Sequence, residues 1–202
     1  MLQLAVGKSR CLDFVGSAIS IGLAINVMAE APNFDTIAML YISFHLLTAL
    51  LFLIRNPPLV RSSVWHSYLV AMISTIYVYS YDLSTDAASD LAGGTILIGA
   101  GGIFGIISLV SLGKCFGVFP ICRGIKTSGL YLIVRHPLYA SYIMMDIGLI
   151  VSYPSQWNGL MLLLGISIFV WRIHYEELLL QTLPGYPTYM SSVRFRLLPF
   201  VY

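Results

Sequence analysis

Long apolar runs with almost no charged residues constrain the fold of this chain more than any other feature. A helix needs about 20 apolar residues to cross a bilayer. Four runs have about this length: Leu12–Ala31, Thr36–Ile54, Ser63–Ser80 and Gly94–Leu112. Of the 202 residues, 58% are hydrophobic and only 10% are charged, against about a quarter charged in a typical globular protein. The sequence therefore excludes an ordinary soluble domain and predicts one integral membrane domain.

Two shorter apolar runs, Leu138–Tyr153 and Gly159–Ile173, follow in the C-terminal half. A helix of about 15 residues reaches only about 24 Å, less than the roughly 30 Å of a hydrocarbon core. We expect a tight helical hairpin that turns at Pro154–Asn158 and returns both ends to the same side. Whether this hairpin crosses the whole bilayer stays open. The predicted fold class is an all-α polytopic membrane protein with about five or six transmembrane helices.

Every lysine and arginine falls on one side of the membrane when these helices are threaded in order. These cations are Lys8, Arg10, Arg55, Arg61, Lys114, Arg123, Lys126, Arg135, Arg172, Arg194 and Arg196. The opposite side receives Glu30, Asp35, Asp82, Asp86 and Asp90. Because lysine and arginine are retained on the cytoplasmic side, we expect both termini, the loop Gly113–Pro137 and the tail from His174 onward in the cytoplasm.

Charge and cysteine usage exclude several partners. A formal net charge of +2 without a block of like charges gives no basis for binding nucleic acid. Cys11, Cys115 and Cys122 have no metal-ligand spacing, so we expect neither a metal site nor a disulfide framework. The predicted partner is the lipid bilayer.

Two local patterns have structural interpretations. Lys8, Arg10, an apolar stretch and Ala29–Ala31 resemble a secretory signal with its cleavage site, but the run is long and further spans follow at once. We expect this first span to be retained, although the sequence alone leaves cleavage as an alternative. Gly101 and Gly105 lie within the fourth apolar run, where small residues allow close packing of helices.

Unusual polar residues crowd into two stretches on the predicted cytoplasmic side. The first, Arg123–Tyr139, contains Gly129, which permits a turn, and Pro137, which suits the first turn of a helix. The second begins at Arg172 and prolongs the last apolar helix. Arg172 and Glu176 stand at positions i and i+4, so both side chains lie on one helix face and can pair or share a ligand. These two stretches are the candidate functional site.

Six motifs follow one another along this half of the chain. They are Leu112-Gly113-Lys114-Cys115-Phe116, Thr127-Ser128-Gly129-Leu130-Tyr131, Arg135-His136-Pro137-Leu138-Tyr139, Glu176-Glu177, Tyr186 with Tyr189, and Arg196 with Pro199. In this order and spacing, Ser111–Pro199 resembles the isoprenylcysteine carboxyl methyltransferases and their prokaryotic and phospholipid-methylating relatives. The N-terminal transmembrane helices of residues 1–112 carry no recognisable signature, and the short chain resembles the compact prokaryotic branch.

The resemblance implies methyl transfer from S-adenosylmethionine, with S-adenosylhomocysteine as product, by a catalytic region over residues 113–202. The cofactor would enter from the cytoplasm, and a hydrophobic or lipid-linked acceptor from the bilayer. The membrane would be the inner membrane of a prokaryote or the endoplasmic reticulum of a eukaryote. The leading expectation is carboxyl O-methylation of an isoprenylcysteine-like or other hydrophobic carboxylate.

The resemblance also implies roles for individual residues. Those implied to contact the cofactor are Arg123, Gly124, Ile125, Lys126, Tyr131, His136, Pro137, Leu138, Tyr139 and Glu176. Arg172 is implied to be the catalytic residue that binds the substrate carboxylate. Asp146 rests on physical grounds alone, since a carboxylate inside the hairpin is costly unless it is paired or lies in a polar cavity. It lines the substrate tunnel, or it bonds to Arg172 or to a neighbouring backbone group; both interpretations stay open.

The chemistry of the residues agrees with these roles. Methyl transfer from a sulfonium is an in-line displacement that mainly needs two reactants held close and aligned. A carboxylate acceptor is already ionised at neutral pH and needs no general base, and the guanidinium of Arg172 can hold it by two parallel hydrogen bonds. Glu176 can accept hydrogen bonds from ribose hydroxyls or from the amino group of the cofactor.

Two other functions stay open. A sibling enzyme would use the same cofactor to methylate the amine of a phospholipid head group or a small thiol, and such an acceptor must lose a proton. A non-enzymatic transporter or scaffold would bind no cofactor. Transporters tend to place polar residues near the bilayer midplane, where Asn26, His45 and Asp146 form no evident chain.

Each polar residue also has a structural interpretation. Arg135 and Arg172 fit interfacial cations that extend toward water, and His136 fits a helix cap. Glu177 fits a solvated carboxylate or a partner of Arg194 or Arg196. The residues that fit an interfacial aromatic belt are Tyr131, Tyr139, Tyr186 and Tyr189.

Overall fold

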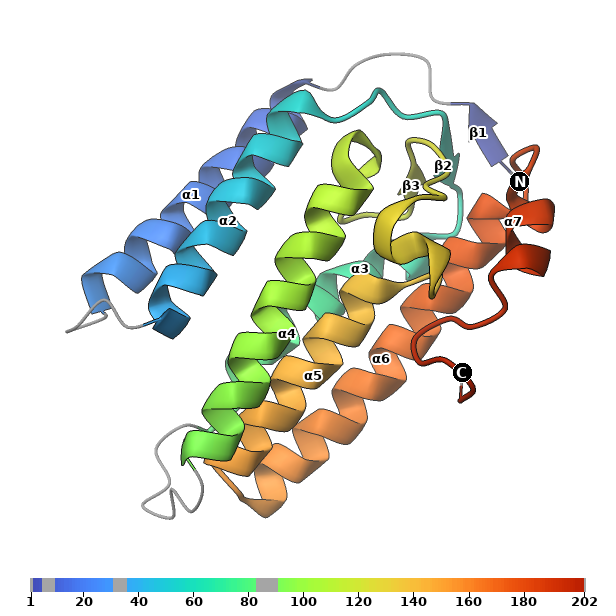
Figure 1. Ribbon diagram of the computed structural model, residues 1–202. Coiled ribbons are helices and arrows are strands. Elements are labelled where there is room, and N and C mark those ends of the chain that lie inside the picture. Colours follow the sequence, from blue (N-terminus) through green and yellow to red (C-terminus); the bar gives the residue numbers. More distant parts are fainter. Residues whose placement is uncertain (1, 5–9, 31–35, 83–90, 202) are drawn as a thin grey trace.

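The computed structural model of the protein describes residues 2–4, 10–30, 36–82 and 91–201 (Figure 1). Its α-helices are α1 (Arg10–Glu30), α2 (Thr36–Ile54), α3 (Trp65–Ile76), α4 (Leu91–Leu112), α5 (Pro137–Ser152), α6 (Gln156–Leu180) and α7 (Tyr186–Ser192). Its 3-10 helices are η1 (Tyr77–Ser80), η2 (Gly113–Cys115) and η3 (Gly129–Leu132). Its strands are β1 (Leu2–Leu4), β2 (Val60–Ser62) and β3 (Ile121–Cys122).

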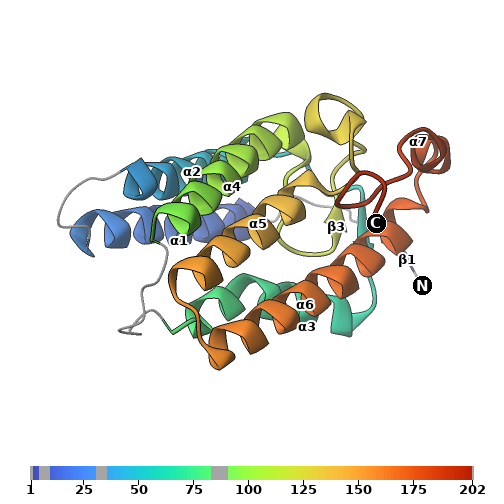
Figure 2. The same ribbon diagram turned by 60° about the horizontal axis from the view of Figure 1, so that its bottom comes forward.

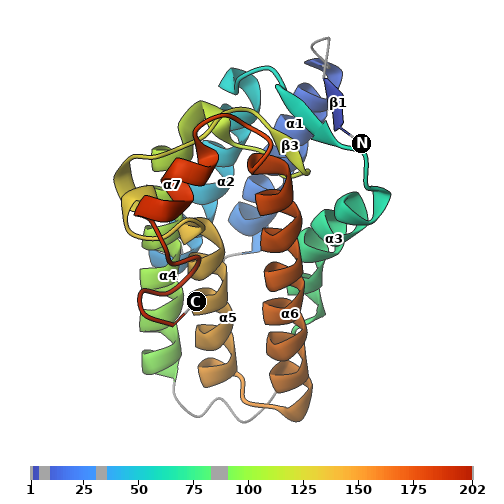
Figure 3. The same ribbon diagram turned by 90° about the vertical axis from the view of Figure 1, so that its right-hand side faces the viewer.

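Helices α4, α5 and α6 form the centre of a bundle and run side by side (Figures 1 and 3). The α1–α2 hairpin packs on α4 through α2, and α3 packs on α6 on another side of the bundle (Figure 2). The irregular segment after α4, helix α7 and the small sheet gather at one end of this bundle (Figure 3). The fold therefore collects the polar stretches at a single end.

Among the described residues, two helical stretches are long and apolar enough to cross a membrane. They are Ala92–Cys115, which is α4 with η2, and Gln156–Leu180, which is α6. The apolar stretches Asp13–Asn26, Ala38–Ile54 and Pro137–Ser152 are shorter. A mostly helical fold with two candidate membrane-spanning helices is thus confirmed, whereas the five or six crossings and the cytoplasmic orientation stay predictions.

The outer faces of the two longest helices are apolar and exposed. Their exposed large side chains include Ile96, Ile103, Ile107 and Val110 on α4, and Leu160, Leu163, Trp171 and Leu178 on α6. Their spacing places each set along one side of its helix. Such long apolar faces are rare on soluble proteins, so they suit contact with lipid.

Three details correct the expectations from sequence. Helix α6 has 25 residues and is about 37 Å long at 1.5 Å per residue, so the second arm of the hairpin is not shorter than a bilayer; its polar end stays helical because those side chains are paired. The run Ser63–Ser80 contains an α-helix of only 12 residues, α3, followed by η1. The fold is not purely helical, because β1, β2 and β3 form an antiparallel sheet in that order.

Some of the predicted features lie outside the described residues. These are Lys8, Ala31 of the cleavage motif, Asp35, Asp86 and Asp90.

Asn158 fixes the turn of the α5–α6 hairpin. Its side chain is fully buried and donates to the carbonyl oxygens of Tyr153 at 2.7 Å and Asp82 at 2.8 Å. It also accepts from the backbone N–H of Asp82 at 2.9 Å. Ser155 caps α6 by accepting from the N–H of Asn158 at 3.0 Å. The turn is therefore held by polar side chains rather than by its length alone.

Small residues bring α4 and α5 into close contact. A Cβ atom added at Gly101 would lie 3.1 Å from the backbone nitrogen of Met145, and one at Gly105 would lie 3.0 Å from the Oγ atom of Ser141. From the opposite side, a Cβ atom at Gly148 would lie 2.8 Å from the carbonyl oxygen of Gly94. The predicted packing role of Gly101 and Gly105 is confirmed.

We expect Gly148→Ala to destabilise the bundle, because its new methyl group would meet backbone atoms of α4 that have no alternative rotamer. Overpacking of this kind costs roughly 1–3 kcal/mol, which thermal unfolding in detergent would reveal as a lower midpoint temperature. Gly99→Ala is the matched control, because nothing lies within 4 Å of its added Cβ atom. Equal midpoints for the two variants would contradict the close contact.

Candidate functional site

A pocket opens at the end of the bundle where the two polar stretches meet. It contains about 810 Å³ of empty volume, part of which is open solvent. Its wall is built from the end of α4, the segment that contains β3, η3, the start of α5, the end of α6 and α7. The fold therefore brings six elements to one site.

Nine of the ten residues predicted to contact the cofactor line this pocket. They are Arg123, Gly124, Ile125, Lys126, Tyr131, His136, Leu138, Tyr139 and Glu176. The tenth, Pro137, is buried in the first turn of α5. Contact with a cofactor stays a prediction, but the structure places these residues around one cavity.

Two glycines shape the chain around the pocket. Gly124 has a φ angle of 144° and Gly129 one of 65°, conformations that side chains with a Cβ atom rarely adopt. Gly129 begins η3, which carries Tyr131 into the pocket wall. The turn predicted at Gly129 is confirmed.

Glu176 faces the pocket, and Tyr139 and His136 are two of the neighbours of its carboxylate. The Tyr139 hydroxyl donates to its Oε1 atom, although the two residues are 37 positions apart. The Nδ1 atom of His136 lies 3.8 Å from its Oε2 atom, and the His136 ring stacks on Tyr139 at 5.8 Å between centroids. The side chain of Glu176 is 23% exposed, so its carboxylate can still accept further hydrogen bonds from a ligand.

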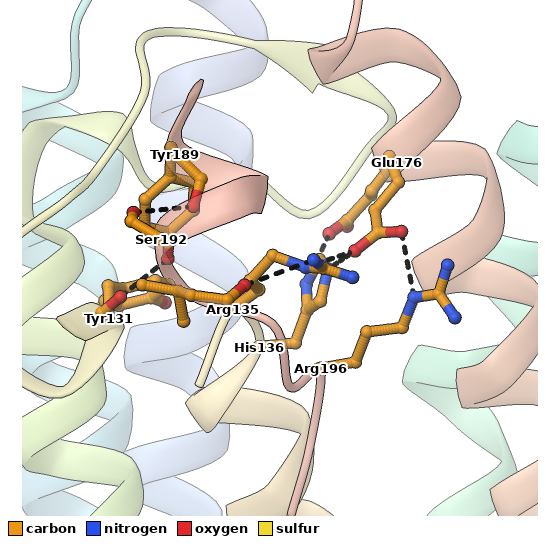
Figure 4. A network of polar contacts seen from close by, with 9 residues as sticks. Tyr131, Arg135, His136, Glu176, Tyr189, Ser192 and Arg196 are labelled. Carbon is orange, nitrogen blue, oxygen red and sulfur yellow. Dashed lines mark hydrogen bonds and ion pairs between the residues drawn. The ribbon is translucent and has the colours of Figure 1, made fainter. Parts of the chain in front are cut away.

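Glu177, the next residue, is buried at the centre of an ion-pair network. Figure 4 shows its partners Arg135, His136 and Arg196 close together. Its side chain is only 3% exposed. Its Oε1 atom lies 2.8 Å from Nε of Arg135 and 3.3 Å from Nε2 of His136. Its Oε2 atom accepts from Nε of Arg196 at 2.9 Å. The interpretation of Glu177 as a solvated carboxylate is wrong, and its pairing with Arg196 is confirmed.

The C-terminal tail is attached to the same network. The backbone N–H groups of Arg135 and His136 donate to the carbonyl oxygens of Phe195 and Arg196 at 2.9 and 2.8 Å. A guanidinium N–H of Arg135 donates to the carbonyl oxygen of Val193 at 3.2 Å. The tail thereby covers the start of α5, and Arg135 is a buried structural cation rather than an interfacial one.

Arg172 lies beside the pocket but does not line it. Its guanidinium donates to Oγ of Ser74 at 2.6 Å and to the carbonyl oxygen of Val118. Its Nε atom lies 3.5 Å from Oε1 of Glu176, and its Cζ atom lies 5.2 Å from the Tyr139 ring centroid. The predicted pair with Glu176 is confirmed, whereas the interfacial interpretation is wrong because Arg172 is buried. Its role toward a substrate stays a prediction.

Asp146 is buried within α5 and does not line the pocket. It accepts a hydrogen bond from the hydroxyl of Tyr77. Its side-chain partner is therefore this tyrosine, and not the alternative partner Arg172. A role in a substrate tunnel stays a prediction.

Arg123 is a buried cation of the pocket wall. Its guanidinium donates to the carbonyl oxygen of Asn56 and lies 4.0 Å from the carboxylate of Asp13. Burial and the neighbouring Arg55 lower the pKa of Arg123 to about 10, and Asp13 partly opposes this shift. Arg123 remains charged at neutral pH and adds positive charge to the pocket.

Tyr186 and Tyr189 pack inside the protein rather than in an exposed belt. The Tyr189 hydroxyl donates to the carbonyl oxygen of Tyr131 at 2.6 Å. Burial raises the pKa of Tyr189 to about 12, with Arg135 opposing the shift, so the hydroxyl keeps its proton and remains a donor. Helix α7 is thus fixed against η3.

Sequence reasoning missed two groups of residues that shape this site. It gave Glu177 no central role. A signal was available, because adjacent residues of a helix point about 100° apart, so only one of the two paired glutamates can face the pocket. It also assigned no part to Asp13 and Asn56, which no motif marks. Among the described residues, no group of His, Cys, Asp and Glu side chains could hold a metal ion.

Comparison with known proteins gives one family match. The model of the phospholipid methyltransferase family matches residues 90–185, a range that contains α4, α5, α6 and most of the pocket. The match agrees with the family resemblance of the motifs. Searches of curated proteins and of solved structures returned no match.

We expect Glu177→Gln to destabilise the protein far more than Glu176→Gln. Removing one member of a buried ion pair costs about 3–5 kcal/mol, and Glu177 has two arginine partners, whereas Glu176 is partly exposed. Thermal unfolding of both variants in detergent measures the difference. Equal loss of stability in the two variants would contradict the assignment of Glu177 to the buried network and of Glu176 to the pocket.

Proposed function

From the assignment of residues 90–185 to the phospholipid methyltransferase family, we propose that this membrane methyltransferase uses S-adenosylmethionine to methylate a hydrophobic carboxylate, such as an isoprenylcysteine, at the cytoplasmic end of its bundle. The observation that carries the proposal is the pocket in which the partly exposed carboxylate of Glu176 is held by Tyr139 and His136.

The donor groups of the pocket fit this cofactor. The carboxylate of Glu176 can accept from ribose hydroxyls or from the adenine amino group. Arg123 and Lys126 offer cationic donors to the amino-acid carboxylate. Ile125 and Leu138 supply apolar wall for the adenine ring. When bound, S-adenosylmethionine supplies a methyl group made electrophilic by the sulfonium.

The chain's own contribution is orientation and shielding. The Tyr139 hydroxyl orients Glu176 by a hydrogen bond, His136 lies 3.8 Å from the same carboxylate, and Glu177 contacts His136 in turn. In-line displacement gains most from such fixed geometry. Helix α7 lines the site through Tyr186 and Tyr189, and exclusion of water from the reacting groups would favour the neutralisation of an anionic acceptor.

Arg172 is the proposed binding residue for the acceptor carboxylate. It lies one helical turn before Glu176, beside the pocket wall, with its guanidinium over Tyr139. To bind a carboxylate, it would exchange its bonds to Ser74 or Val118 for bonds to the substrate.

A phospholipid amine is the second candidate acceptor, and one observation favours it. The guanidinium of Arg172 already has three partners inside the protein, which leaves fewer donors for a carboxylate. The description of the matched family agrees with this alternative.

We expect Glu176→Gln to weaken binding of S-adenosylhomocysteine roughly ten- to hundredfold, because a hydrogen bond to a charged group contributes about 1.5–3 kcal/mol. Calorimetric titration into detergent-purified protein measures the Kd. His174→Gln is the matched control, since His174 is exposed on the same helix and does not line the pocket. The absence of binding to folded wild-type protein would contradict the proposed function.

The acceptor class predicts the pH profile of methyl transfer. A carboxylate is ionised well below neutral pH, so its methylation rate should be nearly constant between about pH 6 and 8. An amine must lose a proton, so its rate should rise with pH by up to about tenfold per unit. Transfer of labelled methyl to a prenylated cysteine and to phosphatidylethanolamine vesicles measures both. If the rate rises steeply with pH and only the amine is methylated, the phospholipid amine replaces the carboxylate as the proposed acceptor.

A further inference from the structure

The N-terminal hairpin lies outside the family-matched residues 90–185, yet its connection to α3 forms the support of one pocket wall. Strand β2 pairs with β3, with Val60 opposite Cys122. Before β2, the N–H of Asn56 donates to the carbonyl oxygen of Lys114 at 2.8 Å, and that of Leu59 to Cys122 at 2.8 Å. Residues 56–62 are therefore bonded along the segment 114–122 that lines the pocket.

Asn56 and Arg123 bond to each other in both directions. The side-chain amide of Asn56 donates to the carbonyl oxygen of Arg123 at 3.3 Å, and the guanidinium of Arg123 donates to the carbonyl oxygen of Asn56. These bonds fix the main chain immediately before Gly124, whose φ angle of 144° directs the pocket wall. The position of the wall is thus set from outside the matched region.

Asp13 places one carboxylate between two buried guanidiniums. Nε of Arg55 donates to its Oδ1 atom at 2.8 Å, and an Nη atom of Arg123 lies 4.0 Å from the same oxygen. The side chains of Arg55 and Arg123 are only 8% and 7% exposed. Two buried like charges repel each other unless an anion lies between them. Asp13 also stands in the first turn of α1, where the helix dipole favours a negative charge.

We propose that Asp13, Arg55 and Asn56 are positioning residues of the cofactor pocket: they hold Arg123 and Gly124 in the wall that the ligand contacts. The inference rests on the proposed function, because the ligand is the cofactor proposed there. None of the three residues lines the pocket, so each acts through Arg123.

The first test measures how well the pocket wall shields a buried cysteine when no cofactor is present. The chain has three cysteines, so a Cys11→Ser/Cys115→Ser background leaves Cys122, which is buried in β3 and lines the pocket. We expect Asp13→Asn and Arg55→Gln in this background to raise the rate of Cys122 alkylation by N-ethylmaleimide at least about fivefold, at a temperature well below unfolding. Arg194→Gln is the matched control, because Arg194 is exposed.

The second test measures the affinity for S-adenosylhomocysteine in protein that keeps all its native cysteines. Asp13→Asn should raise the Kd for S-adenosylhomocysteine about tenfold, and Asp13→Glu should restore most of the affinity because it keeps the carboxylate. In an Arg123→Gln protein the same Asp13→Asn change should add little, since residues that act through one partner are not additive.

The outcomes separate this inference from the proposed function. Unchanged alkylation in both variants overturns the inference, as does faster alkylation with unchanged Kd. Full additivity of Asp13→Asn with Arg123→Gln also overturns it, because Asp13 would then act independently. If wild-type protein binds no S-adenosylhomocysteine while alkylation still accelerates, the proposed function fails and the attachment of the wall stands.

Discussion

The buried carboxylate of Glu177 is the interaction on which the functional end of this protein depends. It joins α6 to the Arg135–His136 segment and, through Arg196, to the C-terminal tail. A carboxylate this deeply buried is stable only with charged partners around it, so these three segments must assemble together. Glu176 can face the pocket because the adjacent Glu177 anchors the end of α6 in the interior.

The site is built from short elements that would not be stable in isolation. Helix α7 has seven residues, η3 has four and β3 has two, and none is long enough to be stable alone. Their positions come from the hydrogen bond of Tyr189 to Tyr131, the pairing of β3 with β2, and the ion pairs of Glu177. The long helices supply a frame that packs through glycines, and polar contacts build the pocket at its end.

The sequence predicted most of the helices because apolar runs leave a local signal, whereas the residues now found around the pocket were nominated by the motifs of the family resemblance. Apolar runs mark helices directly, and the motifs at Tyr131, His136 and Glu176 reach one cavity because a hairpin returns α6 to the start of α5. The predicted continuation of the last apolar helix past Arg172 is confirmed, and α6 extends beyond the apolar run at both ends, from Gln156 to Leu180. The sheet was missed because strands of two or three residues have no detectable period.

The sequence by itself determined that the chain is apolar, helical and suited to a membrane, and that its unusual polar residues occupy two stretches, because composition and spacing are properties of the chain alone. Only the tertiary structure decided which carboxylate faces the pocket, that Arg172 bonds to Ser74 and Val118, and that residues near the N-terminus hold Arg123. Those outcomes depend on which groups are desolvated together, and burial of a charge is decided by neighbours far away in the chain.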